Sequence, residues 1–453
     1  MSNPSTLAAV RFGCGLPFPP NAPETPESIL TVLAGPDLMA QAWPIAGHAR
    51  YVEIIGEMRD LRLSGLDRKS PEMIAAREVF IEQTQAAARD AAVATFARAI
   101  DAPDGFRERL VNFWGDHFSV LATRKLETMF PFAMIEDAVR PHLNGLFSDM
   151  LVAVSLHPAM LVYLDQSSSI GPNSRLGKKQ SKGLNENLAR EVIELHSLGV
   201  GAAYSQTDVT ELARLLAGIT IGPTGEMIFD ERKAEPGPKT LLGKTYTAGG
   251  LDDVRAALRD LALHPGTAKH VARKLAVHFV SDTPDEALVA AVGDAYHSSG
   301  GDLMATYAAM LYHPAAWVNA TTKVRQPFDF IVACCRAIGM TGADIQALNY
   351  KIFKVVILDT MAVMGQPFKR PAGPNGFPEE AEEWITPQGL ARRITWAMRA
   401  PTRLVNPLPD PVTLAQSCLA DRASEGLLWA AARAEDISQG VGLVLASAEF
   451  NRR

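Results

Sequence analysis

Apolar residues recur along most of this 453-residue chain at the three- and four-residue spacing that is typical of helices. Ser70, followed by Pro71, predicts the start of a long helix that ends near Ile100, before a Pro-Asp-Gly break. The next predicted helix carries five large side chains on one apolar face: Phe106, Leu110, Phe113, Trp114 and His117. The pattern therefore predicts a mostly α fold.

Three long segments, 166–182, 222–250 and 365–384, interrupt the helical pattern. Serine, glycine and lysine dominate the first segment, and glycine and proline dominate the other two. The short extended run 226–230 leaves room for one small β-hairpin. Loops of this length are uncommon inside a domain and are often functional. We expect one large multi-helix domain over 1–453 with long irregular loops, and 166–183 as the place where it would divide.

Charge and composition narrow the class of protein. The chain carries 44 Lys and Arg against 50 Asp and Glu, a net charge of -6. This balance argues against general nucleic-acid binding, which needs a basic surface. No apolar run reaches the roughly 18 residues of a membrane span, and the first residues lack the pattern of a signal peptide. We therefore expect a soluble, cytoplasmic protein.

The helix predicted within 183–199 holds most of the candidate chemistry. On a helical wheel Asn187, Arg190, Glu191 and Glu194 form one polar stripe, with Glu186 at its edge. One interpretation is a salt-bridge ladder, because Glu186 and Glu194 each lie four residues from Arg190. The other is a catalytic stripe, in which Glu191 and Glu194 bind a metal or move protons and Arg190 and Asn187 assist.

Two histidines extend the catalytic interpretation to a metal site. His117 lies on an apolar face and His196 on the apolar side of the polar helix, so each is also a candidate core histidine. Asn112 and Asp116 lie on a face beside His117, within reach of it or of the polar helix. Helical bundles build metal sites from side chains on facing helices. The predicted ligands of a divalent metal are His117, His196, Glu191 and Glu194.

A basic segment precedes the polar helix. Lys178, Lys179 and Lys182 carry positive charge close to the predicted helix N-terminus, where anions are attracted. They form either a solvated loop or an anion-binding lid in which Arg190 is the fixed cation. The segment 365–384 would close a pocket with Trp384 as a wall, or is a rigid surface excursion. Trp114 and Asn185 are the other predicted pocket residues.

Three local signals concern helix ends. His-Pro follows an apolar helical stretch at 157–158, 264–265 and 313–314, and we interpret each as a helix junction with proline at the first position rather than as a metal ligand. Thr207 or Asp208 is expected to cap the helix after the polar one, with Glu211 completing a capping box.

These landmarks together resemble a large bacterial family known as domain of unknown function 1800. The resemblance runs in order over nearly the whole chain. It rests on Arg11-Phe12-Gly13, Asn112-Phe113-Trp114, His117-Phe118, His157-Pro158, Leu164-Asp165, Asn185-Glu186-Asn187, Arg190-Glu191, Glu194, His196, Gly237-Pro238-Lys239-Thr240, Arg273-Lys274, Gly365-Gln366-Pro367 and Trp384. It implies one full-length helical domain and no particular activity.

The chain departs from the family pattern in two ways. Many relatives look exported, whereas here the Arg11-Phe12-Gly13 segment begins almost at the first residue. Relatives also often carry a His-Asp pair where this chain has Ala234 and Glu235. If that histidine is a metal ligand or a catalytic group in relatives, its absence puts the same role in doubt for this chain. Members of the family are often encoded beside a secreted sulfatase-like protein, and the resemblance therefore implies a protein partner.

Two functional hypotheses follow. The first is a metal-assisted enzyme that acts on a small or anionic substrate at the polar Glu/Asn/Arg helix. The second is a non-catalytic helical binding or scaffold module that works with a partner protein. Perturbed carboxylates around one pocket would favour the enzyme, whereas a stripe whose charges pair within their own helix would favour the module.

Overall fold

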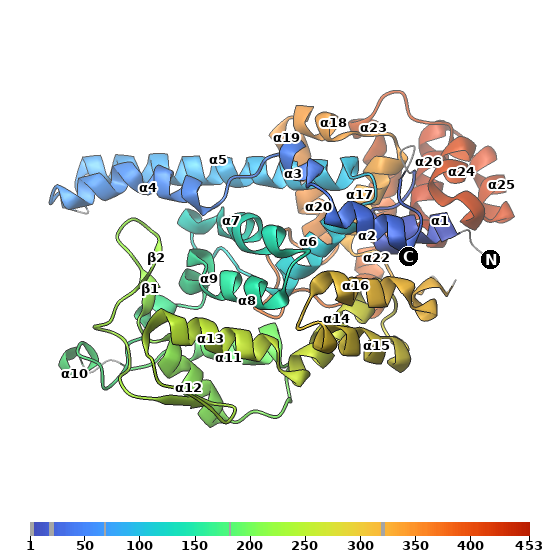
Figure 1. Ribbon diagram of the computed structural model, residues 1–453. Helices are drawn as coiled ribbons and strands as arrows, with labels where there is room; N and C mark the ends of the chain where they lie inside the picture. Colours follow the sequence, from blue (N-terminus) through green and yellow to red (C-terminus); the bar gives the residue numbers. More distant parts are fainter. Residues whose placement is uncertain (1–3, 18–21, 68, 181–182, 319–321) are drawn as a thin grey trace.

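The longest helix among the described residues is α5 (Pro71–Asp101), and it begins as the sequence predicts. The Ser70 hydroxyl accepts the Met73 N–H, and Pro71 occupies the first helical turn. With α4 (His48–Leu63), α5 forms an antiparallel arm that projects from the molecule (Figure 1). This computed structural model describes residues 4–17, 22–67, 69–180, 183–318 and 322–453.

Helices dominate the fold, as predicted. The N-terminal part comprises α1 (Pro4–Leu7), η1 (Ala8–Phe12), α2 (Pro26–Ala34) and α3 (Leu38–Ala42) before the arm. After the arm come α6 (Phe106–His117), η2 (Lys125–Glu127), α7 (Phe130–Met134), η3 (Ile135–Val139), η4 (Arg140–His142), α8 (Phe147–Ser155), α9 (Pro158–Tyr163), η5 (Gln166–Ser168), α10 (Gly177–Gln180), α11 (Asn187–Glu191), η6 (Val192–Ser197) and α12 (Gln206–Leu216).

The second half begins with two hairpins and continues with helices. The helices are α13 (Gly250–Ala262), α14 (Pro265–Phe279), α15 (Glu286–Ser298), α16 (Leu303–Tyr312), η7 (Pro314–Trp317), α17 (Pro327–Ala337), α18 (Gly342–Ala347), α19 (Tyr350–Ile352), η8 (Phe353–Leu358), α20 (Asp359–Val363), α21 (Ala381–Trp384), α22 (Pro387–Arg399), α23 (Pro401–Leu404), α24 (Pro411–Leu419), η9 (Ala420–Arg422), α25 (Glu425–Ala432), α26 (Ile437–Ala446) and α27 (Ala448–Asn451). None of the helices in the described ranges is long and apolar enough to cross a membrane.

The glycine-rich segment near 222–250 forms two small hairpins where one was predicted. Strand β1 (Ile219–Ile221) pairs antiparallel with β2 (Met227–Phe229), which is the predicted extended run. Strand β3 (Lys239–Leu241) pairs with β4 (Lys244–Tyr246). Leu242 and Gly243, both with positive φ, make the tight turn of the second hairpin.

Helix ends test the sequence-based predictions. His157, His264 and His313 each accept a backbone N–H at the start of the next helix, with proline following, so the junction interpretation is confirmed. The predicted cap at Thr207 or Asp208 is wrong. Ser205 is the N-cap, and Asp208 closes its capping box. Ser205 and Asp208 satisfy the same rule, a hydroxyl three residues before an acid, three positions earlier than Asp208 and Glu211.

The polar helix is not a uniform α-helix. Helix α11 continues without a break into η6, a π-helical segment. A π segment forms i→i+5 bonds and widens the turn, so the regular spacing of an α-helix fails after Glu191. His196 is nevertheless buried, as its place on the apolar side predicts.

Two hydrophobic cores meet inside the molecule. The larger includes residues of η1, α6, α8, α9 and α11–α16, and the smaller includes residues of α17, α20, α22, α24 and α26. Helix α6 contributes Phe106, Leu110, Phe113 and Trp114 to the larger core, which confirms its predicted apolar face. We call the boundary between the cores the seam.

Candidate functional site

A cavity lies at the seam, between α6 and the predicted loop 365–384. It encloses about 720 Å³, its open mouth included. We call it the α6 cavity. Met134 of the larger core and Phe328 of the smaller core both line it. Ligand sites favour such junctions. The polar side chains that line it are Arg109, Asn112, Asp116, Ser119, His278, Gln326, Asp329, Gln366, Lys369 and Glu379.

The face of α6 opposite its apolar stripe carries the polar groups. Glu108, Asn112 and Asp116 lie four residues apart, which places them on one side of the helix. Asn112 and Asp116 line the cavity. The Lys369 ammonium of the loop donates to the Asn112 Oδ1 at 3.3 Å. The helix and the loop therefore bring Asn112, Asp116 and Lys369 together at the cavity.

The Asp116 carboxyl is held by the backbone of the loop. Its two oxygens accept the Phe377 N–H at 3.1 and 3.0 Å. Gly376 has a φ of 77°, and a Cβ there would lie 2.5 Å from the Asp116 Oδ2, so only glycine fits. Burial raises the pKa of Asp116 to about 7, against the opposing charge of Lys274.

Lys369 is the second ionisable group with unusual surroundings. Burial lowers the pKa of Lys369 to about 8, although the nearby Asp116 opposes this shift. Its backbone has a φ of 53°, a left-handed conformation that non-glycine residues adopt rarely and that gathers at functional sites. Neither Asp116 nor Lys369 forms an ion pair with another described residue.

The other charged side chains that line the cavity, among the described residues, are paired. The Lys323 ammonium lies 2.6 Å from Asp282 and 3.3 Å from Glu379. Asp329 pairs with Arg109 at 3.6 Å and with Arg453 at 3.2 Å. Because a buried charge without a partner is costly, the exceptions at Asp116 and Lys369 call for a functional explanation.

The contacts of His278 fix its protonation. The ring Nε2 lies 3.1 Å from the Arg109 guanidinium, which can only donate, so Nε2 accepts. The ring Nδ1 therefore carries the proton and donates to Glu379 at 2.6 Å. Burial alone would raise the pKa of Glu379, but His278 and Lys323 hold it at about 2. His278 is thus a neutral wall residue that orients Arg109 and Glu379.

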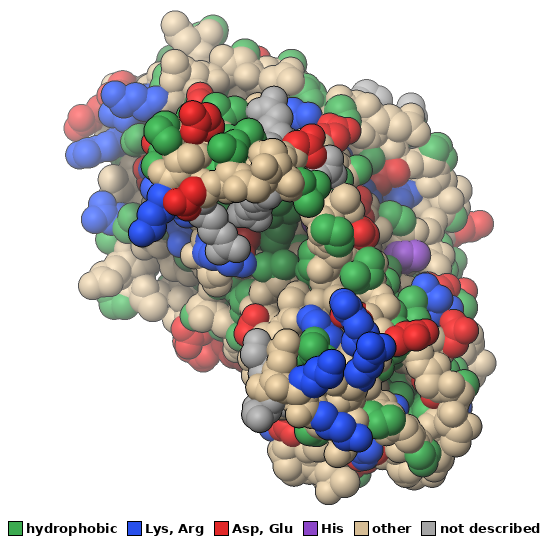
Figure 2. All heavy atoms as spheres, turned by 90° about the vertical axis from the view of Figure 1, so that its left-hand side faces the viewer, with side chains coloured by type: hydrophobic (Ala, Val, Ile, Leu, Met, Phe, Trp, Pro, Cys, Tyr) green, Lys and Arg blue, Asp and Glu red, His purple; other side chains and the backbone are tan. Residues whose placement is uncertain are grey.

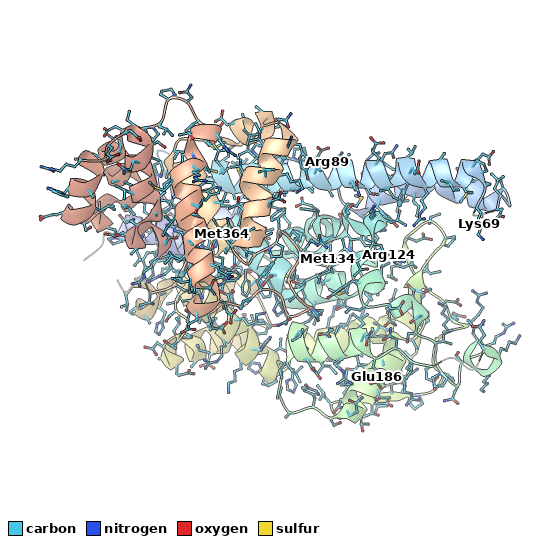
Figure 3. All side chains as sticks on the ribbon, turned by 180° about the vertical axis from the view of Figure 1, so that it is seen from behind. Lys69, Arg89, Arg124, Met134, Glu186 and Met364 are labelled. Carbon is cyan, nitrogen blue, oxygen red and sulfur yellow. The ribbon has the colours of Figure 1, made fainter. Side chains whose placement is uncertain are left out.

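The predicted polar stripe has the arrangement of a salt-bridge ladder. The Arg190 guanidinium lies 3.2 Å from Glu194 and 3.4 Å from Glu186. Glu186 also accepts hydrogen bonds from Gln206 and Thr210 of α12. Figure 3 shows Glu186 on the lower part of the molecule and Met134, a cavity residue, near the middle. The stripe does not line the α6 cavity.

The remaining residues of the stripe have local partners. Glu191 is half-buried. Burial raises its pKa most, and the negative charge of Glu194 raises it as well. Asn187 is exposed, and its N–H donates to the Asn185 Oδ1 at 2.9 Å. The Asn185 amide donates to the backbone carbonyls of Leu164 and Asp165, so it holds the preceding loop against the helix.

The predicted metal ligands do not gather. His117 and His196 are neighbours, with ring centroids 6.2 Å apart, and the His117 Nε2 donates to the His196 carbonyl. Burial, together with the nearby charge of Lys274, lowers the pKa of His196 to about 3. Glu194 pairs with Arg190 instead. Across the described part of the chain, no group of three or more His, Cys, Asp or Glu side chains could hold a metal ion.

The predicted pocket residues lie elsewhere. Trp114 is fully buried and donates to the Tyr307 hydroxyl at 2.7 Å. Trp384 is buried beside Phe377, behind the cavity wall. Lys178 and Lys179 are exposed on α10, where Figure 2 shows basic side chains gathered on one face. Lys182 lies outside the described residues.

The position that departs from the family pattern has a structural use here. Glu235 is buried and accepts hydrogen bonds from the Asn173 N–H at 2.9 Å and the Asn173 side chain at 2.7 Å. It therefore joins the chain near Asn173 to the segment before β3. Ala234 and Glu235 border a separate open groove, away from the α6 cavity.

Sequence reasoning missed the main features of the cavity. It noted Asn112 and Asp116 only as groups within reach of His117 or of the polar helix, and it noted the loop 365–384 without Lys369 or Glu379. The available signal was the spacing of Glu108, Asn112 and Asp116, four residues apart on the face of the helix opposite its apolar residues. What the sequence lacked was any sign that Phe377 lies against Asp116, 261 residues earlier.

Comparison with known proteins gives one match. Residues 26–452 match the family described as "Protein of unknown function (DUF1800)". No curated protein and no solved structure matches the chain. Because the match spans nearly the whole sequence, the chain belongs to the DUF1800 family.

Proposed function

We propose that this protein is an enzyme that moves protons to and from a small polar molecule bound in the α6 cavity. Asp116 and Lys369 are its acid–base pair. The observation that carries this proposal is that both charged side chains face one cavity and neither has an ion-pair partner among the described residues. An enzyme leaves such groups free because they must exchange protons with a ligand.

The acidities of the two groups suit proton transfer. The pKa of Asp116 is about 7 and that of Lys369 is about 8. Near neutral pH each group therefore exists in both of its protonation states, which is the condition for efficient general acid–base catalysis. Arg109 and Asp329, paired with each other, and Glu379, paired with Lys323, form fixed walls around them.

The two earlier hypotheses rest on the polar stripe. For metal-assisted chemistry there, the support is Glu191, whose pKa is raised by burial and by Glu194. For a binding module, the support is the pairing of Arg190 with both of its neighbouring acids. We place the chemistry in the α6 cavity because a perturbed acid and a perturbed base, among the residues that the structure describes, line this one cavity.

A titration combined with a ligand screen tests the proposal. Carbon-13 NMR of labelled aspartate side chains, assigned with Asp116→Asn, is expected to give Asp116 a midpoint near neutral pH. Small polar metabolites that raise the melting temperature of the wild type should lose this effect in Asp116→Asn and Lys369→Met. Asp252→Asn, at an exposed carboxylate, is the matched control. An Asp116 midpoint near the ordinary aspartate value of about 4 would rule the proposal out.

A further inference from the structure

The side chain of Lys369 is placed as a nucleophile would be. Its ammonium lines the α6 cavity, and its only hydrogen bond within the described ranges is the long one, 3.3 Å, to Asn112. The left-handed backbone at this residue aims the side chain toward α6, since a Cβ on Gly115 would lie 3.7 Å from the Lys369 Nζ. An amine that serves only to neutralise a buried acid would be expected in direct contact with it.

The neighbours of Lys369 supply the other parts of a carbonyl-condensing site. Phe328, Phe368 and Met134 form apolar walls that limit access of water to the amine. Asp116 lines the same cavity and interacts electrostatically with Lys369. A nucleophilic amine beside a proton donor, in a partly dry site, is the arrangement that imine formation requires.

We propose that Lys369 forms an imine with the carbonyl carbon of a small, uncharged, hydroxylated aldehyde or ketone bound in the α6 cavity. This inference rests on the proposed function, because it uses the same cavity and the same acid, Asp116. It adds the class of substrate and the covalent step.

The step balances without an external oxidant or reductant. The neutral Lys369 amine adds to the carbonyl carbon, and the carbonyl oxygen takes a proton from Asp116. The nitrogen then loses a proton to the Asp116 carboxylate, which returns it to the departing hydroxyl, and water leaves. The product is the protonated imine, with Asp116 left as the carboxylate. It withdraws electrons from the neighbouring carbon, so that a C–H or C–C bond there can break. Hydrolysis restores the amine.

The charges around the cavity favour an uncharged substrate. The Arg109 guanidinium already contacts Asp329 and His278, and Lys323 behind the wall contacts Asp282 and Glu379. Among the described lining residues, Lys369 is therefore the one cation without an acid partner, and imine formation uses it. In the described lining, a carboxylate or phosphate would find no second cation that is free of an acid partner, whereas hydroxyl groups can bond to Asp116 and Ser119.

Reductive trapping tests the inference directly. The full chain is incubated at pH 7 with glyceraldehyde and cyanoborohydride, and the modified lysines are located by peptide mass spectrometry. An adduct adds the mass of the aldehyde less one oxygen atom. We expect Lys369 to react at least roughly tenfold faster than the exposed Lys178 and Lys351, because burial lowers the pKa of Lys369 to about 8 and so leaves more of its amine neutral than in an ordinary lysine. Pyruvate, which is charged, should label Lys369 more slowly.

Variants separate the roles and the possible failures. Asp116→Asn should slow labelling of Lys369 and leave Lys178 and Lys351 unchanged, with its fold checked by thermal melting. Labelling of Lys369 no faster than that of the exposed lysines overturns the inference. If that occurs while Asp116 still titrates near neutral pH and ligands still bind, only the imine is rejected. If Asp116 does not titrate there, the proposed function itself fails.

Discussion

Asp116 occupies a place where its charged form is costly, and the pH dependence of folding reports this. Burial raises its folded pKa to about 7, from an ordinary value of 3.8. Between these values the folded state holds a proton that the unfolded state has lost. The stability due to this group is therefore complete below about pH 4 and is lost as the pH rises through 7.

Asp116→Asn should remove this loss, because the amide is always neutral and its oxygen can still accept the Phe377 N–H. We expect the free energy of unfolding of the variant, relative to that of the wild type, to grow by about 1–3 kcal/mol between pH 5 and pH 8. Urea unfolding at several pH values measures the difference. A difference between variant and wild type that stays the same from pH 5 to pH 8 would contradict the raised pKa. Asp252→Asn, at an exposed site, is the control.

At the scale of elements, the sequence patterns predicted those features that depend on residues close together in the chain. The cap at Ser70, the His-Pro junctions and the apolar face of α6 were predictable because each depends on residues within a few positions. The π segment η6 was not, because the same residues suit an ordinary helix. The pairing of loop 365–384 with α6 joins residues far apart in the chain, so the site that depends on it was not predictable.

Gly376→Ala tests how the loop holds the acid. The positive φ and the close approach of Asp116 should force the backbone of the loop away, which lengthens the Phe377 hydrogen bonds. Those bonds favour the carboxylate, so their loss should raise the pKa of Asp116 further and cost about 1–3 kcal/mol of stability. Carbon-13 NMR and thermal melting measure both. Gly373→Ala is the control, because its new Cβ would meet only the movable Asn375 side chain. Similar behaviour of the two variants would show that the loop does not hold Asp116.

At the scale of the molecule, the α6 cavity lies where two cores meet, and buried ion pairs cross the seam. Lys323, fully buried, contacts Asp282 just beyond α14 and Glu379 of the loop. His278 and Arg109 of the larger core are joined in turn to Glu379 and Asp329. A ligand bound among these groups would contact both cores, so its binding would stabilise the junction.

Lys323→Met should therefore weaken the whole molecule and not only one part. It leaves two acids near the seam without their ammonium partner, and breaking such a buried pair costs about 3 kcal/mol or more. Because the pKa of Glu379 is held low partly by Lys323, the variant's Glu379 should also protonate at a higher pH. In urea, a single transition should move to lower concentration with an unchanged slope, since the two cores depend on the same bridge. Lys354→Met, which breaks an exposed pair with Asp359, should cost less than about 1 kcal/mol. Two separate transitions in Lys323→Met would show instead that the cores unfold independently and that the ion pairs add little to their union.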